Sequence, residues 1–567
     1  MQQRTPQISK TERALALTAA AFPLALALVF VPQLEAPFSA AKNAVFVSGA
    51  AVLFSMSLLA GRTRRRWPSL LPLALAAFVS VTLVSAAFSP YRHMSLHGVV
   101  WIISGALLLV AMSRVRAEHL SWIIHGVAVS GTAVAIITLA QHFLRVDLFA
   151  LFGHESPTSG RMRLYSTLGN PDFVGTYLAA ALPAVLVSSR RGFWRTVQVA
   201  TTTAICAAVI VTGSRAGLLA LAVAAVVFFA VAHRVSRRTM IVGAIAVCLV
   251  LAGTFARRFN ARSLGETLRG RTMIWHVTLA EHNASWLVGS GPNTFAYLYP
   301  ERLGRFLAEA SRASLMRFAG HERHAQNDFL EMLSENGVLG VAAFGALLLA
   351  WLLWMFRKLP SATESSRAGE FAAALAGIAA VSTAGLFDFP LHRAETWALF
   401  SVWFAVPLTL ALEDTANTDK RIQSVRLGLT VRAVAAVVVC AVAIPIALRP
   451  AVASYWIGTA ERHEDAGQIE AAEKALYDAL ALEPASPTAQ FDLTRVLAKQ
   501  DRFEAALEQS RLAVRFVNEP ELYILRSRIC MALSDPERAR AELQRATELF
   551  PYSDELSDEL AFITARP

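Results

Sequence analysis

Long apolar runs follow one another from residue 13 to residue 450 of this 567-residue chain. Each run is close to the roughly 20 residues that a helix needs to cross the hydrocarbon core of a bilayer. Applied along the chain, this length rule predicts about thirteen membrane spans. They centre on residues 14–31, 42–60, 68–88, 94–113, 120–143, 174–189, 196–213, 216–233, 239–256, 337–356, 370–389, 395–412 and 431–448. The chain is therefore predicted to be all-α, a polytopic membrane helix bundle of about 12–13 spans.

The charge content of the chain supports this assignment. Only 17% of the residues are charged, whereas soluble proteins usually carry about 25%. A formal net charge of +11 would favour a nucleic-acid partner in a soluble chain. Many of the basic residues here lie in short gaps between apolar runs, so membrane topology explains them and no nucleic acid is expected.

The connecting loops alternate in positive charge. The positive-inside rule assigns the more basic set of loops, and with it the N-terminus, to the cytoplasm. An odd number of spans then carries the C-terminus across what we interpret as a bacterial inner membrane, into the periplasm. The same topology places a long loop, residues 257–336, on the outer face, and long loops are usually functional. The basic set contains Arg62, Arg64, Arg65, Arg66, Arg114, Arg116, Arg190, Arg191, Arg195, Arg234, Arg237, Arg238, Arg357, Lys358, Lys420, Arg421 and Arg426.

The end of the chain contains an internal repeat. Ala471, Ala505 and Ala539 follow one another at intervals of 34 positions, which is the period of tetratricopeptide repeats. We predict that residues 1–450 form the membrane domain and that residues 451–567 form an extracytoplasmic tetratricopeptide-like α-solenoid. Such stacks are binding surfaces, so this one could take a protein partner. Unrelated amphipathic helices are the alternative interpretation.

The outer loop 257–336 contains ten arginines and no lysine. A guanidinium group pairs bidentately with phosphate or carboxylate and stays charged at any working pH. The positive-inside rule does not require these charges on the outer face. We therefore predict that the set, which includes Arg269 and Arg271, binds a phosphate-bearing ligand. Contact with anionic lipid headgroups and salt bridges to Glu266, Glu281 and Glu301 are the alternatives.

Two further clusters lie at predicted outer ends of spans. Arg215 sits in a tight break between two spans, within Gly213-Ser214-Arg215-Ala216-Gly217. An arginine at the membrane edge is a functional candidate, although its side chain could also extend to lipid headgroups. Arg163 precedes Asn170-Pro171, a pair that favours a turn before a helix. Asn170 would then lie near a helix N-terminus, where anions are favoured.

The segment from His321 to Gly340 is predicted to be a helix that begins in the outer loop and leads into the next span. His324 could take a proton from a hydroxyl near neutral pH, or it could be a solvated histidine without a role. His321 and His324 could also form a metal pair, but no third ligand is near in the sequence. We therefore predict no metal site.

Four motifs occur in order along the chain: GNPDFVGTYLAAALP (169–183), TGSRAG (212–217), GRTMIW (270–275) running to GSGPNTF (289–295), and HAQNDFLEMLSENGVLG (324–340). They resemble the motifs of the O-antigen ligase/polymerase superfamily of membrane glycan transferases, over roughly residues 14–412. The resemblance implies transfer of an undecaprenyl-pyrophosphate-linked glycan to an acceptor hydroxyl on the outer face of the membrane. It implies neither a cofactor nor a catalytic metal.

The resemblance also implies roles for single residues. Arg215 and Arg271 match family arginines that stabilise the charge developing on the pyrophosphate, and Arg163 matches more loosely. With His324 and Gln326, these two arginines form the predicted catalytic set. The predicted set for binding pyrophosphate or glycan is Arg163, Asn170, Arg269, Trp275 and Asn327.

One departure from the family pattern concerns the general base. The ligases have a histidine eleven positions before the glycine that matches Gly337, and this chain has Gln326 there. Glutamine cannot accept a proton from a hydroxyl. His324 could take the role, but on a regular helix it would point about 200° away from Gln326. The substitution therefore requires an irregular backbone in this stretch.

Three interpretations of function follow. The first is an enzyme that transfers or polymerises lipid-linked glycan, with a glycolipid, a glycan or a protein as acceptor; the exported repeats favour a polymeric or protein acceptor. The second is a non-enzymatic, membrane-anchored scaffold for assembly of envelope polysaccharide, which Gln326 favours. The third, a lipid-glycan transporter, would require charged residues near the middle of the spans, and the sequence has few there.

Overall fold

The computed structural model describes residues 10–60, 67–68, 70–153, 164–187, 192–232, 261–280, 286–309, 312, 315–316, 318–320, 322–363, 367–416 and 428–565. All regular structure in this described part is helical. The all-α prediction is therefore confirmed. The predicted span 239–256, Arg163 and His321 lie outside the described residues.

The described residues contain nine helices long and apolar enough to cross a membrane and three shorter apolar helices. The long ones are α1 (Lys10–Leu28), α2 (Ala40–Leu59), α3 (Leu70–Phe88), α4 (Arg92–Ser113), α5 (Leu120–Phe143, counted as a span with the 3₁₀ turn Ala117–His119), α8 (Phe193–Thr212), α9 (Arg215–Ala232), α13 (Asp328–Thr363, the span ending at Lys358) and α16 (Leu429–Asp465). The shorter ones are α7 (Pro171–Val187), α14 (Ala368–Ala384) and α15 (Ala394–Ala416). Each predicted span that falls on described residues coincides with one of these helices. The chain is a multi-pass membrane protein.

The centre of the bundle is formed by α7, α14 and α15, whose small residues allow close approach of the backbones. Gly377 of α14 faces the ring of Trp403, which is fully buried. The indole of Trp403 donates a hydrogen bond to the carbonyl of Ala180 over 2.8 Å. This bond ties α15 to α7 and satisfies a polar group that would otherwise be unpaired in an apolar core.

Helix α13 is interrupted at Gly337, which has φ 68° and ψ −173°. The helix begins at Asp328, because residues 322–327 are irregular, and it forms two pieces. The predicted start at His321 lies outside the described residues. The loop carrying Trp286 and Leu287 fills the break, because Val338 N donates to the carbonyl of Trp286 (3.0 Å) and Leu339 N to that of Leu287 (3.1 Å). On the other side, Gly291 N donates to the carbonyl of Glu335 over 2.9 Å. These bonds satisfy backbone groups that the break leaves without helical partners.

The C-terminal part is a stack of short helices that follows α16 without a gap, since α16 continues through Arg449-Pro450 to Asp465. Consecutive helices of the stack pack against one another, around a core that contains Ala472, Ala506 and Ala539. The helices are α17 (Ile469–Leu482), α18 (Pro487–Lys499), α19 (Phe503–Ala513), α20 (Pro520–Ala532), α21 (Pro536–Leu549) and α22 (Asp554–Thr564). Their identity as tetratricopeptide repeats remains a prediction.

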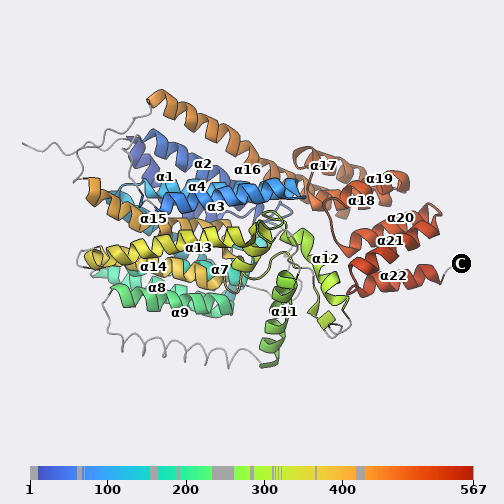
Figure 1. The fold of residues 1–567 in the computed structure, drawn as a ribbon, viewed down its shortest axis with the longest axis horizontal. Helices are drawn as coiled ribbons and strands as arrows, with labels where there is room; N and C mark the ends of the chain where they lie inside the picture. Colours follow the sequence, from blue (N-terminus) through green and yellow to red (C-terminus); the bar gives the residue numbers. More distant parts are fainter. Residues whose placement is uncertain are drawn as a thin grey trace, which may run out of the picture.

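The stack lies beyond one end of the span helices, and α11 (Ala261–Ala280) and α12 (Phe295–Leu307) lie between the two parts (Figure 1). Tyr297 of α12 connects them: its hydroxyl donates to the carbonyl of Val514 over 3.1 Å. Its own carbonyl accepts a hydrogen bond from the amide of Asn518 over 2.9 Å. A Cβ atom on Gly304 would lie 1.8 Å from the carbonyl oxygen of Leu549, so α12 and α21 are in direct backbone contact.

Candidate functional site

The start of α13 carries the polar centre of the structure. The stretch before it is irregular, and Gln326 adopts a positive φ of 53°. Asn327 then caps the helix: its side-chain oxygen accepts hydrogen bonds from the backbone N–H groups of Phe329 (2.9 Å) and Leu330 (3.0 Å). Its amide group donates to the carbonyl of Leu386 over 3.0 Å. Asn327, predicted as a binding residue, is thus occupied in holding the helix start against the loop between α14 and α15.

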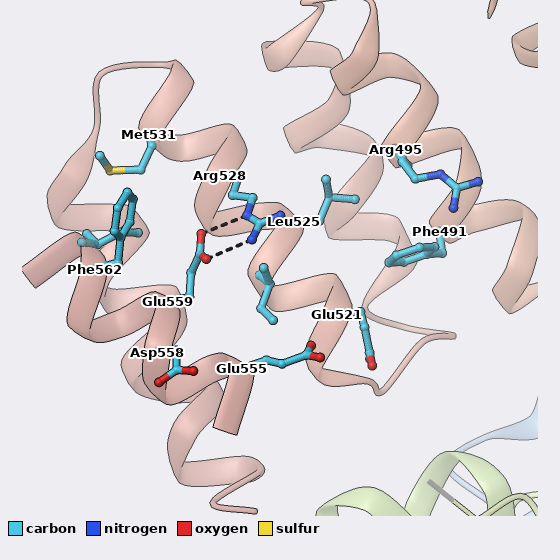
Figure 2. A pocket seen from close by; sticks show the side chains of 12 residues that line it. Phe491, Arg495, Glu521, Leu525, Arg528, Met531, Glu555, Asp558, Glu559 and Phe562 are labelled. Atoms are coloured by element: carbon cyan, nitrogen blue, oxygen red, sulfur yellow. Dashed lines mark hydrogen bonds and ion pairs between the residues drawn. The ribbon is translucent and has the colours of Figure 1, made fainter. Parts of the chain in front are cut away.

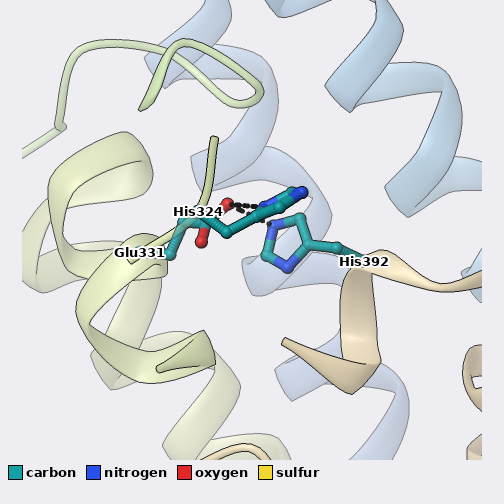
Figure 3. Close-up of side chains that lie close together, drawn as sticks. All are labelled: His324, Glu331 and His392. Carbon is teal, nitrogen blue, oxygen red and sulfur yellow. Dashed lines mark hydrogen bonds and ion pairs between the residues drawn. The ribbon is translucent and has the colours of Figure 1, made fainter. Parts of the chain in front are cut away.

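Glu331 lies one turn into α13 with a side chain that is only 2% exposed. One carboxylate oxygen lies 2.8 Å from Nδ1 of His324, and the other accepts a hydrogen bond from the backbone N–H of Ala325 over 2.8 Å. The first oxygen also lies 3.3 Å from Nε2 of His392. Figure 3 shows the two imidazole rings meeting at this carboxylate. A buried carboxylate needs such partners, because an unpaired one would be strongly destabilising.

His392 lies in the short 3₁₀ turn Pro390–His392 between α14 and α15. Its Nδ1 lies 3.0 Å from a carboxylate oxygen of Asp328, so both ring nitrogens face carboxylates. Burial alone would lower the pKa of His392, but Glu331 and Asp328 outweigh it and raise the pKa to about 10. At neutral pH His392 is therefore an imidazolium that donates to both acids.

His324 has a different arrangement. Its Nδ1 donates to Glu331, which fixes the tautomer with the lone pair on Nε2. Nε2 has no hydrogen-bond partner within the described part of the chain. The ring stacks on Phe389 with centroids 3.9 Å apart and planes at 17°, and the side chain remains 30% exposed. A histidine oriented by a carboxylate, with its other nitrogen accessible, is arranged to accept a proton.

Gln326 is outside this network. Its amide nitrogen lies 3.4 Å from a carboxylate oxygen of Glu322, a weak contact. The backbone at Gln326 is irregular. The sequence required such an irregularity if His324 is to serve as the base. Trp275 of α11 supports this backbone, because its indole N–H donates to the carbonyl of Ala325 over 3.2 Å. Trp275 therefore positions the segment between the histidine and the glutamine.

The predicted arginines approach the same region from α9 and α11. Arg215 is the first residue of α9 and lies within electrostatic range of Arg271 and Asp172. Asp388, four residues before His392, is buried. Burial and the nearby charge of Asp172 raise the pKa of Asp388 to about 7, and Arg271 opposes this shift. Arg271 and Asp172 thus act electrostatically on both Arg215 and Asp388.

Two helix N-termini lie side by side there. Asn170 precedes α7, and its side-chain oxygen accepts a hydrogen bond from the N–H of Asp172 over 2.9 Å. Ser214 caps α9 in the same way, accepting from Gly217 N over 3.0 Å. The two helices touch at their first turns, since a Cβ atom on Gly217 would lie 2.6 Å from Cα of Gly175. Helix N-termini carry partial positive charge and exposed N–H groups, which favours an anion beside them.

The structure thus brings His324, Arg215, Arg271, Asn170 and Trp275 toward one end of the bundle. Arg269 is on the exposed side of α11. Sequence reasoning missed Glu331, Asp328, His392 and Asp388. A signal was present for the first two, because acidic residues at the start of an otherwise apolar span are costly unless they are paired. No comparable signal pointed to His392.

His324, Glu331 and His392 also offer ligand atoms that all lie within 4.8 Å of one another, a separation that could suit a metal ion. His392 supplies the third ligand that the sequence did not reveal. Both ring nitrogens of His392 already face carboxylates. A cation bound in the cluster would therefore have to displace the proton that His392 shares with Glu331. We therefore interpret the cluster as a hydrogen-bonded relay.

Fold and site together define a multi-pass membrane protein with a polar centre where several spans end. Residues 200–345 match the family model described as O-Antigen ligase. The chain therefore contains an O-antigen ligase domain in this segment, which includes Arg215, Arg271, Trp275, His324 and Glu331. No curated protein matches the chain. The family supports a function in ligating or polymerising glycans at a membrane.

Proposed function

We propose that this protein transfers a glycan from undecaprenyl pyrophosphate to an acceptor hydroxyl on the outer face of the bacterial inner membrane. The observation that carries the proposal is the pairing of His324 with Glu331, 2.8 Å apart, which leaves Nε2 available as a base. The O-antigen ligase domain supports the class of reaction. The donor, the acceptor and the roles of single residues belong to the proposal.

The donor pyrophosphate would lie at the N-termini of α7 and α9, against Arg215 and Arg271. During transfer the bond between the glycan anomeric carbon and the pyrophosphate oxygen breaks, and negative charge grows on the leaving group. Fixed guanidinium groups and helix N–H groups stabilise that charge without rearranging, which is the most effective form of electrostatic catalysis. The arginines thereby take the part that a divalent cation plays in many phosphate-handling enzymes.

The acceptor hydroxyl would lie against Nε2 of His324. As its oxygen forms the new bond to the anomeric carbon, its proton moves to Nε2, and lipid pyrophosphate leaves. Glu331 then stabilises the imidazolium of His324. His392 and Asp328 are positioning residues, because their hydrogen bonds keep Glu331 ionised and oriented.

The proposal that the site lies on the outer face of the membrane rests on charge and on the arrangement of the loops. The residues of the site come from segments that the positive-inside rule assigns to the outer face, namely those preceding α7, α9, α13 and α15. The helical stack lies at this same end of the bundle (Figure 1). We propose that residues 451–567 form a periplasmic repeat domain beside the site, and that residues 1–450 form the membrane domain.

The test is a transfer assay with purified protein, an undecaprenyl-pyrophosphate-linked glycan from the same organism and EDTA throughout. Wild type would be compared with Arg215→Ala, and with Arg305→Ala as a matched control. Arg305 lies in the outer loop 257–336 that also contains Arg271, is half exposed and forms an ion pair with Glu301. We expect wild type and Arg305→Ala to release lipid pyrophosphate and Arg215→Ala to release at least about 100-fold less.

Two results would contradict the proposed mechanism. Full activity of Arg215→Ala would exclude the arginine role, and loss of wild-type activity on EDTA treatment that zinc or magnesium restores would exclude a metal-independent reaction. Absence of transfer with native glycolipid, glycan and protein acceptors would favour the non-enzymatic scaffold. The scaffold interpretation further predicts an envelope phenotype that survives Arg215→Ala but not deletion of residues 455–567.

A further inference from the structure

A groove with a volume of about 980 Å³ opens on the helical stack, away from the His324 site. Alternate helices of the stack line it, namely α18, α20 and α22. Figure 2 shows their side chains converging on it, with the carboxylates of Glu521, Glu555 and Asp558 along one edge and Met531 and Phe562 on another side. The groove therefore has two chemically distinct parts.

One part of the groove is apolar. Leu525 and Met531 pack on the core of the stack and present a face to the groove. Phe562 of α22 is 51% exposed. The stack lies outside the spans, so lipid does not explain exposure of a large aromatic side chain there. Apolar side chains gathered in a concavity mark a surface that another molecule can cover.

The other part of the groove is acidic, and its two cations are already paired. Arg528 forms two bonds to the carboxylate of Glu559, at 2.9 and 3.0 Å. Arg495 pairs with Asp492 at 2.8 Å and with Glu464 at 3.0 Å.

The remaining charges of the groove are all negative. Glu521, Glu555 and Asp558 form no ion pair with any described residue. The carboxylates in the lining outnumber the arginines by four to two. The lining thus has unneutralised negative charge beside its apolar surface.

We propose that this groove binds a cationic peptide segment of another protein. Lysine or arginine side chains of the segment would pair with Glu521, Glu555 and Asp558, and its apolar side chains would cover Leu525, Met531 and Phe562. An acidic glycan would be repelled by these carboxylates. A neutral glycan would find no amide, hydroxyl or indole group in the lining. The inference does not depend on the proposed transfer reaction, because the groove contains none of its residues.

The test is direct binding to the full chain in nanodiscs of zwitterionic lipid, with empty nanodiscs subtracted. The probe is a fluorescent twelve-residue peptide of four lysines, two phenylalanines, glycine and serine. A second peptide has glutamate in place of each lysine. The variant Glu521→Gln/Glu555→Gln/Asp558→Asn removes the groove charges. The control Glu504→Gln/Glu537→Gln/Glu548→Gln removes three exposed carboxylates from α19 and α21, which do not line the groove.

We expect the lysine peptide to bind wild type and the control equally, and the groove variant at least about tenfold more weakly. Phe562→Ala should also weaken binding by about tenfold, without a change in charge. The glutamate peptide should not bind.

Three results with the peptides would overturn the inference. The first is that the lysine peptide does not bind wild type at millimolar concentration. The second is that the control variant weakens binding of this peptide as much as the groove variant does. The third is that the lysine and glutamate peptides bind wild type equally. Binding of a soluble polysaccharide that the groove variant abolishes would assign the groove to a glycan instead.

Discussion

His324 donates its Nδ1 proton to Glu331 over 2.8 Å, across the irregular turn that contains Gln326. Because of this bond, we favour His324 over Gln326 as the candidate general base. A regular helix would have pointed His324 away from the position of Gln326, whereas the positive φ of Gln326 allows His324 to reach the carboxylate of the first turn of α13. Asp328 and His392 complete a hydrogen-bonded relay. Its residues come from the segment before α13, from the first turn of α13 and from the turn before α15.

The first prediction concerns these two candidates for the base. His324→Ala should reduce glycan transfer by about 100-fold or more, because it removes the proton acceptor. Gln326→Ala should stay within about threefold of wild type, since its weak contact to Glu322 lies outside the relay. The measurement is initial rate of lipid-pyrophosphate release under saturating donor. The reverse order of the two variants would return the acceptor role to Gln326.

The second prediction concerns the break in α13. Gly337→Ala should lower stability by about 3 kcal/mol, because a side chain is strained at this φ and ψ. Its Cβ would also lie 2.3 Å from the carbonyl oxygen of Leu287. Gly345→Ala is the matched control in the same helix, where a Cβ meets nothing within 4 Å. Thermal unfolding in detergent should show a lower Tm for the first variant and an unchanged or slightly higher Tm for the second. Equal Tm values would mean that the break is not required.

The third prediction is a loss of stability in alkali that depends on His392. Its pKa rises from 6.5 to about 10 in the folded protein. The stabilisation is therefore complete below about pH 6.5 and is lost progressively as the pH rises toward 10. The Tm of wild type should therefore fall over this range. The corresponding loss in the free energy of unfolding should be a few kcal/mol at most. His392→Gln should start lower and show a flatter curve. Parallel curves for the two proteins would contradict the charge assignment.

The fourth prediction concerns the carboxyl group of Asp388. Burial raises its pKa from 3.8 to about 7, so the folded state holds a proton that the unfolded chain releases. Stability then falls as the pH rises from about 4 to 7, and stays lower above that. Asp388→Asn keeps an acceptor for the N–H of Phe389 and removes this cost. Its Tm should equal that of wild type near pH 4 and exceed it at pH 8. A Tm gain that is the same at both pH values would have another cause.

Local sequence patterns predicted the membrane fold well, for a physical reason. Each span must satisfy its own backbone hydrogen bonds and present apolar side chains to lipid, so composition over some 20 residues determines it. The break near Gly213 and the helix start after Asn170 were equally local, because glycine, serine and asparagine act on the backbone within a few residues. Arg215 and Arg271 became candidates through the resemblance of short motifs to those of the ligases.

The relay could only be found in the folded chain. Glu331 falls within the helix that the sequence predicts from His321 to Gly340, and nothing in the sequence around His392 distinguishes it from a loop residue. Their partnership depends on packing of the loop before α15 against the start of α13, more than 50 positions away in the chain. The conformation at Gln326, which directs His324 toward Glu331, depends likewise on Trp275 of a distant helix. The sequence by itself determined the apolar spans, the repeat period and the motifs that resemble those of the ligases, because these follow from neighbours along the chain. Tertiary structure alone brought His324, Glu331 and His392 together, because this arrangement depends on contacts between segments far apart in sequence.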